Sequence, residues 1–370
     1  MSLLPQNPPP MHGGQLRQIT ARYGISSELL IDFSANINPA GPPPSVMAAI
    51  RRALEGALAL ARYPDLDLFE LKQTIAGSVG VESENIAVAN GFAPLLEAAL
   101  RSLKIERCLL PVPSFSEYRR TLENAGVGIT PYRLPQDKGF EYEIDAILKA
   151  LLDHSCDAIL LANPQNPSGV LCDAGRMRRL IDTVAQHSIT VLLDEAFIDY
   201  CPFASLTRPP AEQPNVIVFR SVTKFFAIPG LRVAYAISTS RHIRAMDRSI
   251  APWPITSFAS EAVCAALQDG AYAEESRHAN EQRRVWLEQE LARLKIATYA
   301  SSANFLLLRF PAALDVSLLW ERMIVEEQIV LRSCANFEGL AAEHLRIAVR
   351  SEPENERLIR GLERLLSSFE

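Results

Sequence analysis

Short runs of apolar residues alternate with longer segments of helical spacing along the first two thirds of the chain. The runs are three to five residues long and rich in aliphatic side chains, which is typical of strands buried on both faces of a parallel sheet. They comprise Ile86 to Val88, Cys108 to Leu110, Ala158 to Ala162, Ile189 to Leu193, Val216 to Phe219 and Val233 to Ile237. This pattern predicts an α/β fold with a mostly parallel sheet.

The segments between these runs predict helices. From Met177 to Val184, apolar residues recur at the i, i+3, i+4, i+7 spacing of an amphipathic helix. A second helix, with an apolar face from Leu95 to Leu103, is expected to begin at Gly91-Phe92-Ala93. Helices that connect parallel strands cover both faces of the sheet, so we expect that arrangement here.

The pattern changes after about Pro254. A long charged helix is expected from Tyr272 to Leu294, then a strand from Asn304 to Phe310, a further helix, a strand around Arg346 and a final helix from Glu354. We therefore expect a large domain of residues 31–254 and a smaller α/β C-terminal domain of residues 255–370.

Residues 1–30 are expected to form an N-terminal arm that packs with the small domain. Proline removes a backbone donor and fixes φ, so a cluster of prolines predicts that this arm forms no helix and packs as an extended segment. The prolines are Pro5, Pro8, Pro9 and Pro10.

Composition narrows the possible partners. The 370 residues are 48% hydrophobic with a net charge of −6, and no sustained basic run is present, which argues against nucleic acid as a partner. The six cysteines are scattered, without the spacing of a metal site or a disulfide framework, and predict reduced thiols in a cytoplasm. The start of the sequence lacks a basic segment followed by an apolar core, and no apolar stretch approaches the ~20 residues of a membrane span, so we expect no membrane association.

Polar residues follow three neighbouring predicted strands. Asn166 comes after one strand, Asp194 ends the next, and Ser221 follows the third. Ligands of such sheets bind just beyond the carboxyl ends of the strands, so these residues predict the site.

Lys224 lies in Arg220-Ser221-Val222-Thr223-Lys224-Phe225-Phe226, with Arg232 shortly after it. A lysine amine forms a Schiff base with an aldehyde once partial burial and a nearby cation lower its pKa. A lone lysine after a strand is more often a surface residue. The combination with Asp194 and Asn166 favours a reactive role.

These residues match the requirements of pyridoxal phosphate. Its ring nitrogen must stay protonated, which needs a carboxylate such as Asp194, and its phenolic oxygen needs a neutral donor such as Asn166. Its phosphate needs hydroxyls, helix amides and a cation. For the phosphate, the sequence offers Ser221, Thr223, Arg232 and the helix that begins at Gly91, Phe92 and Ala93.

With these motifs in place, the chain resembles the fold-type-I pyridoxal-phosphate enzymes of the aminotransferase superfamily, in the branch of the histidinol-phosphate aminotransferases. Within that branch it is similar to the L-threonine-O-3-phosphate decarboxylases of cobalamin biosynthesis. The segments that carry this narrower resemblance are Met11 to Gly14, Asp32 to Pro39, Arg62 to Asp65, Asp194 to Asp199, Thr223 to Arg232 and Leu331 to Asn336.

The resemblance implies roles for matching positions around the cofactor. Lys224 would carry the cofactor, Asp194 would pair with the ring nitrogen, and Asn166 would donate to the phenolic oxygen. Phe115 would stack on the ring. Tyr63 would reach the cofactor phosphate of a neighbouring subunit, which implies a homodimer with shared active sites.

The resemblance also implies a substrate site, with no metal. Arg346 would bind the α-carboxylate, and Arg332 with His12 would hold the substrate phosphate, although the division between the two arginines is left open. Gly13 and Asn36 would lie beside the substrate.

Three functions remain at this point. The implied reaction is decarboxylation of L-threonine O-3-phosphate to 1-amino-2-propanol O-phosphate and carbon dioxide. An aminotransferase acting on histidinol phosphate would use the same pocket residues. A non-catalytic cofactor-binding module of a transcription regulator is disfavoured because Lys224 is kept and no residues are left for a DNA-binding domain.

Overall fold

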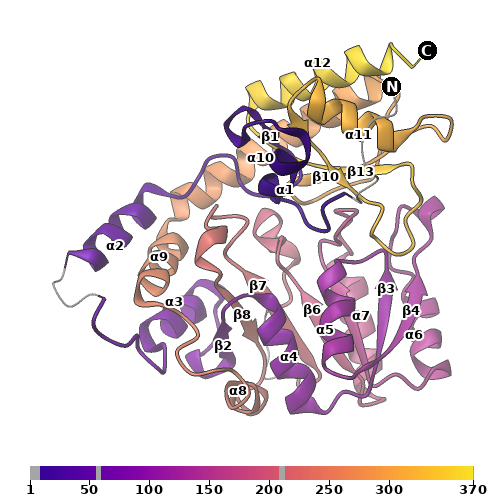
Figure 1. The fold of residues 1–370 in the computed structure, drawn as a ribbon. Coiled ribbons are helices and arrows are strands. Elements are labelled where there is room, and N and C mark those ends of the chain that lie inside the picture. Colours follow the sequence, from indigo (N-terminus) through magenta and orange to yellow (C-terminus); the bar gives the residue numbers. More distant parts are fainter. Residues whose placement is uncertain (1–8, 56–59, 208–212, 370) are drawn as a thin grey trace.

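A seven-stranded sheet forms the centre of the molecule in the computed structural model, which describes residues 9–55, 60–207 and 213–369 (Figure 1). The strand order is β2-β8-β7-β6-β5-β3-β4. The strands from β7 to β4 run parallel, and β8 is antiparallel to both of its neighbours. The strands are β2 (Ile86–Ala89), β3 (Arg107–Val112), β4 (Gly128–Arg133), β5 (Ala158–Ala162), β6 (Thr190–Asp194), β7 (Val216–Ser221) and β8 (Ala234–Ile237).

The six strands predicted from apolar runs are confirmed, each with ends within two residues of the prediction. The sequence pattern did not reveal β4, which lies at the sheet edge and alternates between half-buried and exposed residues. Pro131 is tolerated there because an edge strand can spare a backbone donor.

Helices cover both faces of this sheet, as predicted. Side chains alternate along each strand, so Val218 of β7 packs into one apolar core while Phe219 packs into the other. One core is completed by α2 (Pro44–Leu54), α3 (Phe69–Val79), α6 (Ile144–Asp153), α7 (Ala174–Ala185) and α9 (Ser257–Gln268). The other is completed by α4 (Phe92–Leu103), α5 (Ser116–Asn124) and α8 (Ser240–Asp247).

A second, antiparallel sheet has the order β12-β13-β10-β9 and its own apolar core. Its strands are β9 (Ala297–Thr298), β10 (Phe305–Arg309), β12 (Arg332–Ser333) and β13 (His344–Ala348). The helices α10 (Gly270–Arg293), α11 (Val316–Val325) and α12 (Glu352–Leu366) contribute to this core. Figure 1 shows these elements on one side of the large sheet.

The N-terminal segment packs with the second sheet. Helix α1 (Leu16–Tyr23) places Ile19 in the core of that sheet, and β1 (Ile31–Asp32) pairs in parallel with β11 (Ile329–Val330). The prediction that the arm forms no helix is wrong for α1, because the helix begins after Pro9 and Pro10 and contains no proline itself; Pro5 and Pro8 lie outside the described residues.

The division into domains at residue 254 stays a prediction. Helix α9 follows that boundary, yet Ala262 and Val263 pack in the core of the large sheet, against α2 and α3. We therefore propose that the smaller domain begins after α9.

Two searches of the described residues bear on other functions. No helix among them is long and apolar enough to span a membrane. Nowhere in the same residues do three or more His, Cys, Asp or Glu side chains gather in a way that could hold a metal ion.

Candidate active site

The register of the large sheet brings the predicted polar residues to one edge. Asp194, the last residue of β6, pairs with Ala162 of β5 and with Phe219 of β7. Ser221, at the end of β7, lies in register with the last residue of β2 through β8. The loops that carry Asn166, Lys224 and Gly91 therefore leave the sheet side by side.

Lys224 is half-buried between groups of both charges. Its Nζ donates a hydrogen bond to Thr223 Oγ1 at 2.9 Å. Burial above all, together with the positive charges of Arg232 and Arg346, lowers the pKa of Lys224 to about 8, against the opposing effect of the Asp194 carboxylate. A substantial fraction of this amine is thus neutral, and nucleophilic, near physiological pH.

Asp194 is a buried carboxylate with a donor on each oxygen. Oδ2 accepts a hydrogen bond from Tyr118 Oη at 2.5 Å, and Oδ1 accepts one from the Ala196 N–H at 2.8 Å. Burial raises the pKa of Asp194, whereas the two hydrogen bonds and the charge of Lys224 lower it. The arrangement suits a carboxylate that must stay ionised beside a protonated ring nitrogen.

Tyr118 is a site residue that the sequence argument missed. Its position three residues after Phe115, at the start of a helix, places the two rings together, with centroids 5.6 Å apart. The three-residue spacing between Phe115 and Tyr118 was the signal in the sequence that could have identified Tyr118.

A candidate phosphate site lies where α4 begins. Gly91, the N-cap residue, has φ +97°, and a Cβ there would lie 3.0 Å from Arg232 Nη2, so glycine lets the guanidinium approach the helix start. Ser221 Oγ and Thr223 Oγ1 are hydrogen-bonded to each other at 2.7 Å. Helix amides, a guanidinium and two hydroxyls match the needs of a phosphate dianion.

Phe92 and Ala93 offer only backbone amides to this site. The ring of Phe92 packs 5.4 Å from Tyr118 and 5.2 Å from Phe219, between centroids, so it serves the apolar core beneath the helix start.

Arg346, on β13, reaches from the second sheet to the large one. Its Nη1 donates to Asn166 Oδ1 at 2.6 Å and its Nη2 donates to the Ser34 carbonyl at 3.3 Å. Burial, and then the charge of Arg332, lowers the pKa of Arg346 to about 9. Because the Asn166 oxygen is engaged by Arg346, its NH₂ group is the part left to donate to a ligand.

Arg332 lies opposite Arg346, as its cross-strand partner on β12. It donates to the Met11 carbonyl at 2.5 Å and to Asn336 Oδ1 at 2.7 Å, so it holds the N-terminal arm over the site. His12 on that arm contacts the Glu117 carboxylate, with Nε2 3.0 Å from Oε1. The two predicted phosphate ligands thus lie on neighbouring segments, each with a protein partner that the sequence did not suggest.

The arm makes a close backbone contact at Gly13. A Cβ at Gly13 would lie 2.0 Å from the Ser34 carbonyl oxygen, so any larger residue would push the arm away. Asn36, two residues after Ser34, is buried, and its Oδ1 has no hydrogen-bond partner within the described part of the chain. The same holds for Arg346 Nε. Buried polar atoms of this kind fit a ligand that completes their hydrogen bonds.

Two of the predicted residues, Phe115 and Tyr63, lie at the margin of the candidate site. Phe115 caps the start of α5, with its ring 6.2 Å from that of His12. Tyr63 lies apart from the other site residues: its side chain is 80% exposed and its ring packs 4.7 Å from Trp253.

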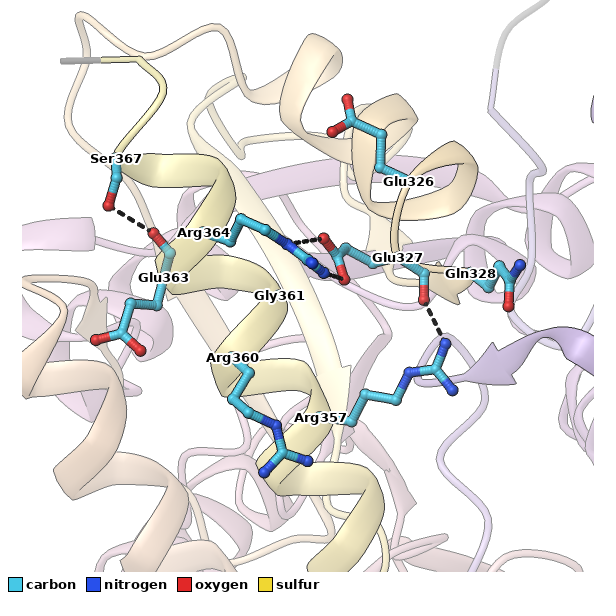
Figure 2. Close-up of a pocket in the computed structure, with 9 residues that line it drawn as sticks. All are labelled: Glu326, Glu327, Gln328, Arg357, Arg360, Gly361, Glu363, Arg364 and Ser367. Atoms are coloured by element: carbon cyan, nitrogen blue, oxygen red, sulfur yellow. Dashed lines mark hydrogen bonds and ion pairs between the residues drawn. The ribbon is translucent and has the colours of Figure 1, made fainter.

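A separate surface groove of about 710 Å³ lies beside α12 (Figure 2). None of the predicted site residues lines it. Figure 2 shows that its central charges pair with each other, Arg364 with Glu327, while Arg357 donates to the Glu327 carbonyl at 3.0 Å. We therefore place the active site at the sheet edge and not in this groove.

Comparison with known proteins reveals relatives over nearly the whole chain. The sequence pattern of the family described as aminotransferase class I and II matches residues 28–362. A threonine-phosphate decarboxylase of Salmonella typhimurium is 36% identical over 361 residues, 97% of each chain. An adenosylcobalamin biosynthesis bifunctional protein of Leptospira interrogans is 28% identical over 95% of this chain and 40% of its own length. A histidinol-phosphate aminotransferase of Sinorhizobium meliloti, crystallised with pyridoxal-5'-phosphate, has a TM-score of 0.80 at 25% identity, covering 91% of this chain and 90% of that one.

The low pKa of Lys224 gives a testable prediction. The reaction of the protein, freed of cofactor, with added pyridoxal 5'-phosphate should accelerate as the pH rises through about 8, because only the neutral amine attacks the aldehyde. Arg346→Gln removes a positive charge that lowers this pKa, so its profile should lie at higher pH. Stopped-flow absorbance measures both profiles.

Arg309→Gln, at the exposed end of β10, is the matched control and should follow the wild type. If Arg346→Gln also follows the wild type, the charge of Arg346 does not act on Lys224.

Proposed function

We propose that this chain, which belongs to the aminotransferase class I and II family, decarboxylates L-threonine O-3-phosphate to 1-amino-2-propanol O-phosphate as a step of cobalamin biosynthesis. Family membership confirms the resemblance inferred from the sequence, the fold-type-I architecture and the pyridoxal-phosphate cofactor. The decarboxylase and the cobalamin protein among the relatives support the choice of reaction.

The observation that carries this proposal is a pair of buried guanidinium groups, one of which, Arg346, acts on Lys224. Arg332 and Arg346 are only 4% and 6% exposed, are cross-strand partners, and have no carboxylate partner among the described residues. Two buried like charges are costly unless anions accompany them. A substrate that carries both a carboxylate and a phosphate supplies two anions at once.

Each group of the site has a distinct task in the reaction. Arg346 holds the carboxylate, and Arg332 with His12 holds the phosphate. The Cα–carboxylate bond breaks, carbon dioxide leaves, and Cα takes up one proton. Pyridoxal phosphate supplies the electron sink that accepts the electron pair of that bond. Lys224, with its lowered pKa, is placed to donate the proton to Cα and to release the product amine.

A histidinol-phosphate aminotransferase is the second candidate, because the Sinorhizobium meliloti enzyme shares the fold over most of both chains. Lys224, Asp194 and Asn166 serve that reaction equally well. Histidinol phosphate has no α-carboxylate, so it leaves one of the two buried arginines without an anion in the first half of the reaction.

A homodimer with shared active sites is part of the proposal. Exposed apolar side chains gather along one stretch of sequence around α2 and α3, with Trp253 stacked beside them. A surface of this kind is typical of a protein interface. This exposed apolar surface comprises Met47, Leu54, Leu60, Tyr63, Leu66, Phe69 and Trp253. A cytoplasmic location also belongs to the proposal, in line with the six free cysteine thiols.

The reaction itself is tested by product analysis. The pyridoxal-phosphate-loaded protein is given L-threonine O-3-phosphate without any keto acid, and histidinol phosphate with 2-oxoglutarate in a parallel tube. We expect carbon dioxide and aminopropanol phosphate in the first tube. Glutamate formed in the second tube alone would establish the aminotransferase instead.

The division of the two anions between the arginines can be read from kinetics. Arg346→Gln and Arg332→Gln should each raise KM by about tenfold to a hundredfold, since each removes a charged hydrogen bond. The product keeps the phosphate but has lost the carboxylate. Inhibition by the product should therefore weaken in Arg332→Gln and stay unchanged in Arg346→Gln.

Arg309→Gln is again the control, with unchanged KM. The reverse pattern of product inhibition would exchange the two roles, and unchanged KM in both arginine variants would remove them from the substrate site.

The shared active site predicts complementation between two inactive variants. Lys224→Ala and Tyr63→Ala each lose activity alone. In a mixture of both, half of the dimers pair one subunit of each kind and one of their two sites is intact, so about a quarter of wild-type activity should return. Activity that stays absent after subunit exchange, with dimers proven by light scattering, would contradict the role of Tyr63.

A further inference from the structure

Tyr118 is the one buried hydroxyl that contacts the carboxylate of Asp194 in the described structure. Its side chain is 2% exposed, and its Oη donates to Asp194 Oδ2 at 2.5 Å. The other oxygen, Oδ1, accepts the Ala196 N–H at 2.8 Å. The carboxylate therefore has one fixed donor on each side and cannot rotate without breaking a buried hydrogen bond.

The start of α5 fixes the position of Tyr118. The Tyr118 N–H donates to the Phe115 carbonyl at 3.0 Å, which closes the first turn of the helix. The Tyr118 ring stands at 89° to that of Phe115 and lies 5.4 Å from that of Phe92. A ring held between two others has little freedom to turn, so the hydroxyl points at Asp194 permanently.

One helix turn thus joins two contacts to the cofactor ring. Phe115 is expected to stack on the face of that ring, and Tyr118 supports the carboxylate expected at its nitrogen. Because the two residues share a turn, their spacing is set by the helix and not by loop motion.

The electrostatics agree with this geometry. Burial raises the pKa of Asp194, and the hydrogen bond from Tyr118 is the largest effect that lowers it. Burial and the charge of Asp194 raise the pKa of Tyr118 well above its ordinary value, so the proton stays on the phenol. Without this donor, Asp194 would more readily take up a proton, and a neutral acid cannot hold a charged ring nitrogen.

We propose that Tyr118 is a positioning residue, which fixes the orientation and the charge of Asp194 and thereby keeps the ring nitrogen of the cofactor protonated. This inference rests on the cofactor that the proposed function requires. It holds for decarboxylation and for transamination alike.

Two other titratable groups lie near Asp194. Lys224 faces it from the loop after β7 and acts on its pKa, and Tyr142, on the side of β5, is itself affected by the charge of Asp194. The Tyr142 hydroxyl donates to the Ala162 carbonyl at 2.8 Å instead of to Asp194. Tyr142→Phe therefore removes an equally buried hydroxyl without touching the carboxylate, and serves as the matched control.

The protonation state of the ring nitrogen can be measured directly. Wild type, Tyr118→Phe and Tyr142→Phe are loaded with pyridoxal 5'-phosphate labelled with ¹⁵N in the ring, and the ¹⁵N chemical shift is followed by NMR against pH. In Tyr118→Phe the nitrogen should lose its proton about one to two pH units lower than in the wild type, a change of about ten- to a hundredfold in proton affinity. Tyr142→Phe should titrate as the wild type does.

A second substitution acts in the opposite direction. Placing 3,5-difluorotyrosine at position 118 keeps the shape of Tyr118 and makes its hydroxyl a stronger donor, so the nitrogen should hold its proton to higher pH. If Tyr118→Phe does not fold, this second variant still tests the proposal. If the ¹⁵N titration is the same in wild type and in either variant at position 118, Tyr118 only fills space and the proposal is wrong.

Kinetics separate this inference from the proposed reaction. In Tyr118→Phe, kcat for carbon dioxide release should fall about tenfold or more with KM changed less than about twofold, because the substrate contacts remain. A protein that releases no carbon dioxide from L-threonine O-3-phosphate would overturn the decarboxylase and leave the ¹⁵N result intact. A normal decarboxylase with an unchanged ¹⁵N titration would overturn the role of Tyr118 alone.

Discussion

An excess of buried positive charge at the carboxyl edge of the large sheet governs the site. Arg232, Arg346 and the Asp194 carboxylate all act on Lys224, and Arg332 acts in turn on Arg346. Burial is the main cause that lowers the pKa of Lys224 and of Arg346, and the neighbouring positive charges add to it, so anions are needed to balance the site. A cofactor phosphate and a doubly anionic substrate supply what is missing, so the same imbalance that costs stability in the empty protein favours binding of both.

The two sheets divide this charge between them. The large sheet carries Lys224, Asp194 and Arg232, the residues proposed to hold the cofactor, while the second sheet carries Arg332 and Arg346 on β12 and β13. Arg346 joins the two parts through its hydrogen bonds to Asn166 and to the Ser34 carbonyl. Any change in the angle between the sheets would move the substrate anions relative to Lys224, so the precision of the site depends on this contact.

Much of the fold was predictable because the central strands are buried on both faces and read as continuous apolar runs. The edge strand β4 was not predicted because its residues are half-buried or exposed and do not form a continuous apolar run. The position of Lys224, Asp194 and Asn166 at one edge of the sheet was predictable because each lies at, or a few residues after, the carboxyl end of a strand; their roles stay predictions. Tyr118 was not, because its partner lies 76 positions away and only folding brings the two together. The partners of His12 and Arg332, namely Glu117 and the arm carbonyls, were hidden for the same reason. The roles of Tyr63 and Phe115 stay predictions.

Specificity for one reaction is therefore a matter of where the substrate anions are held and not of which residues hold the cofactor. Lys224, Asp194 and Asn166 suit decarboxylation and transamination alike. The two reactions differ in the group at Cα that must lie toward Lys224. A guanidinium in a fixed position sets which group that is. Arg346 lies in hydrogen-bond contact with Asn166, deep in the site, while Arg332 lies one strand further out under the N-terminal arm. A carboxylate held at the inner arginine and a phosphate at the outer one would fix two points of the substrate, and its amino group at the cofactor would be the third, so the orientation of Cα would be set. Under the proposed function, selection between the reactions resides in β12, β13 and the arm; of these, the arm and the run from Leu331 to Asn336 also carry the resemblance to the decarboxylases.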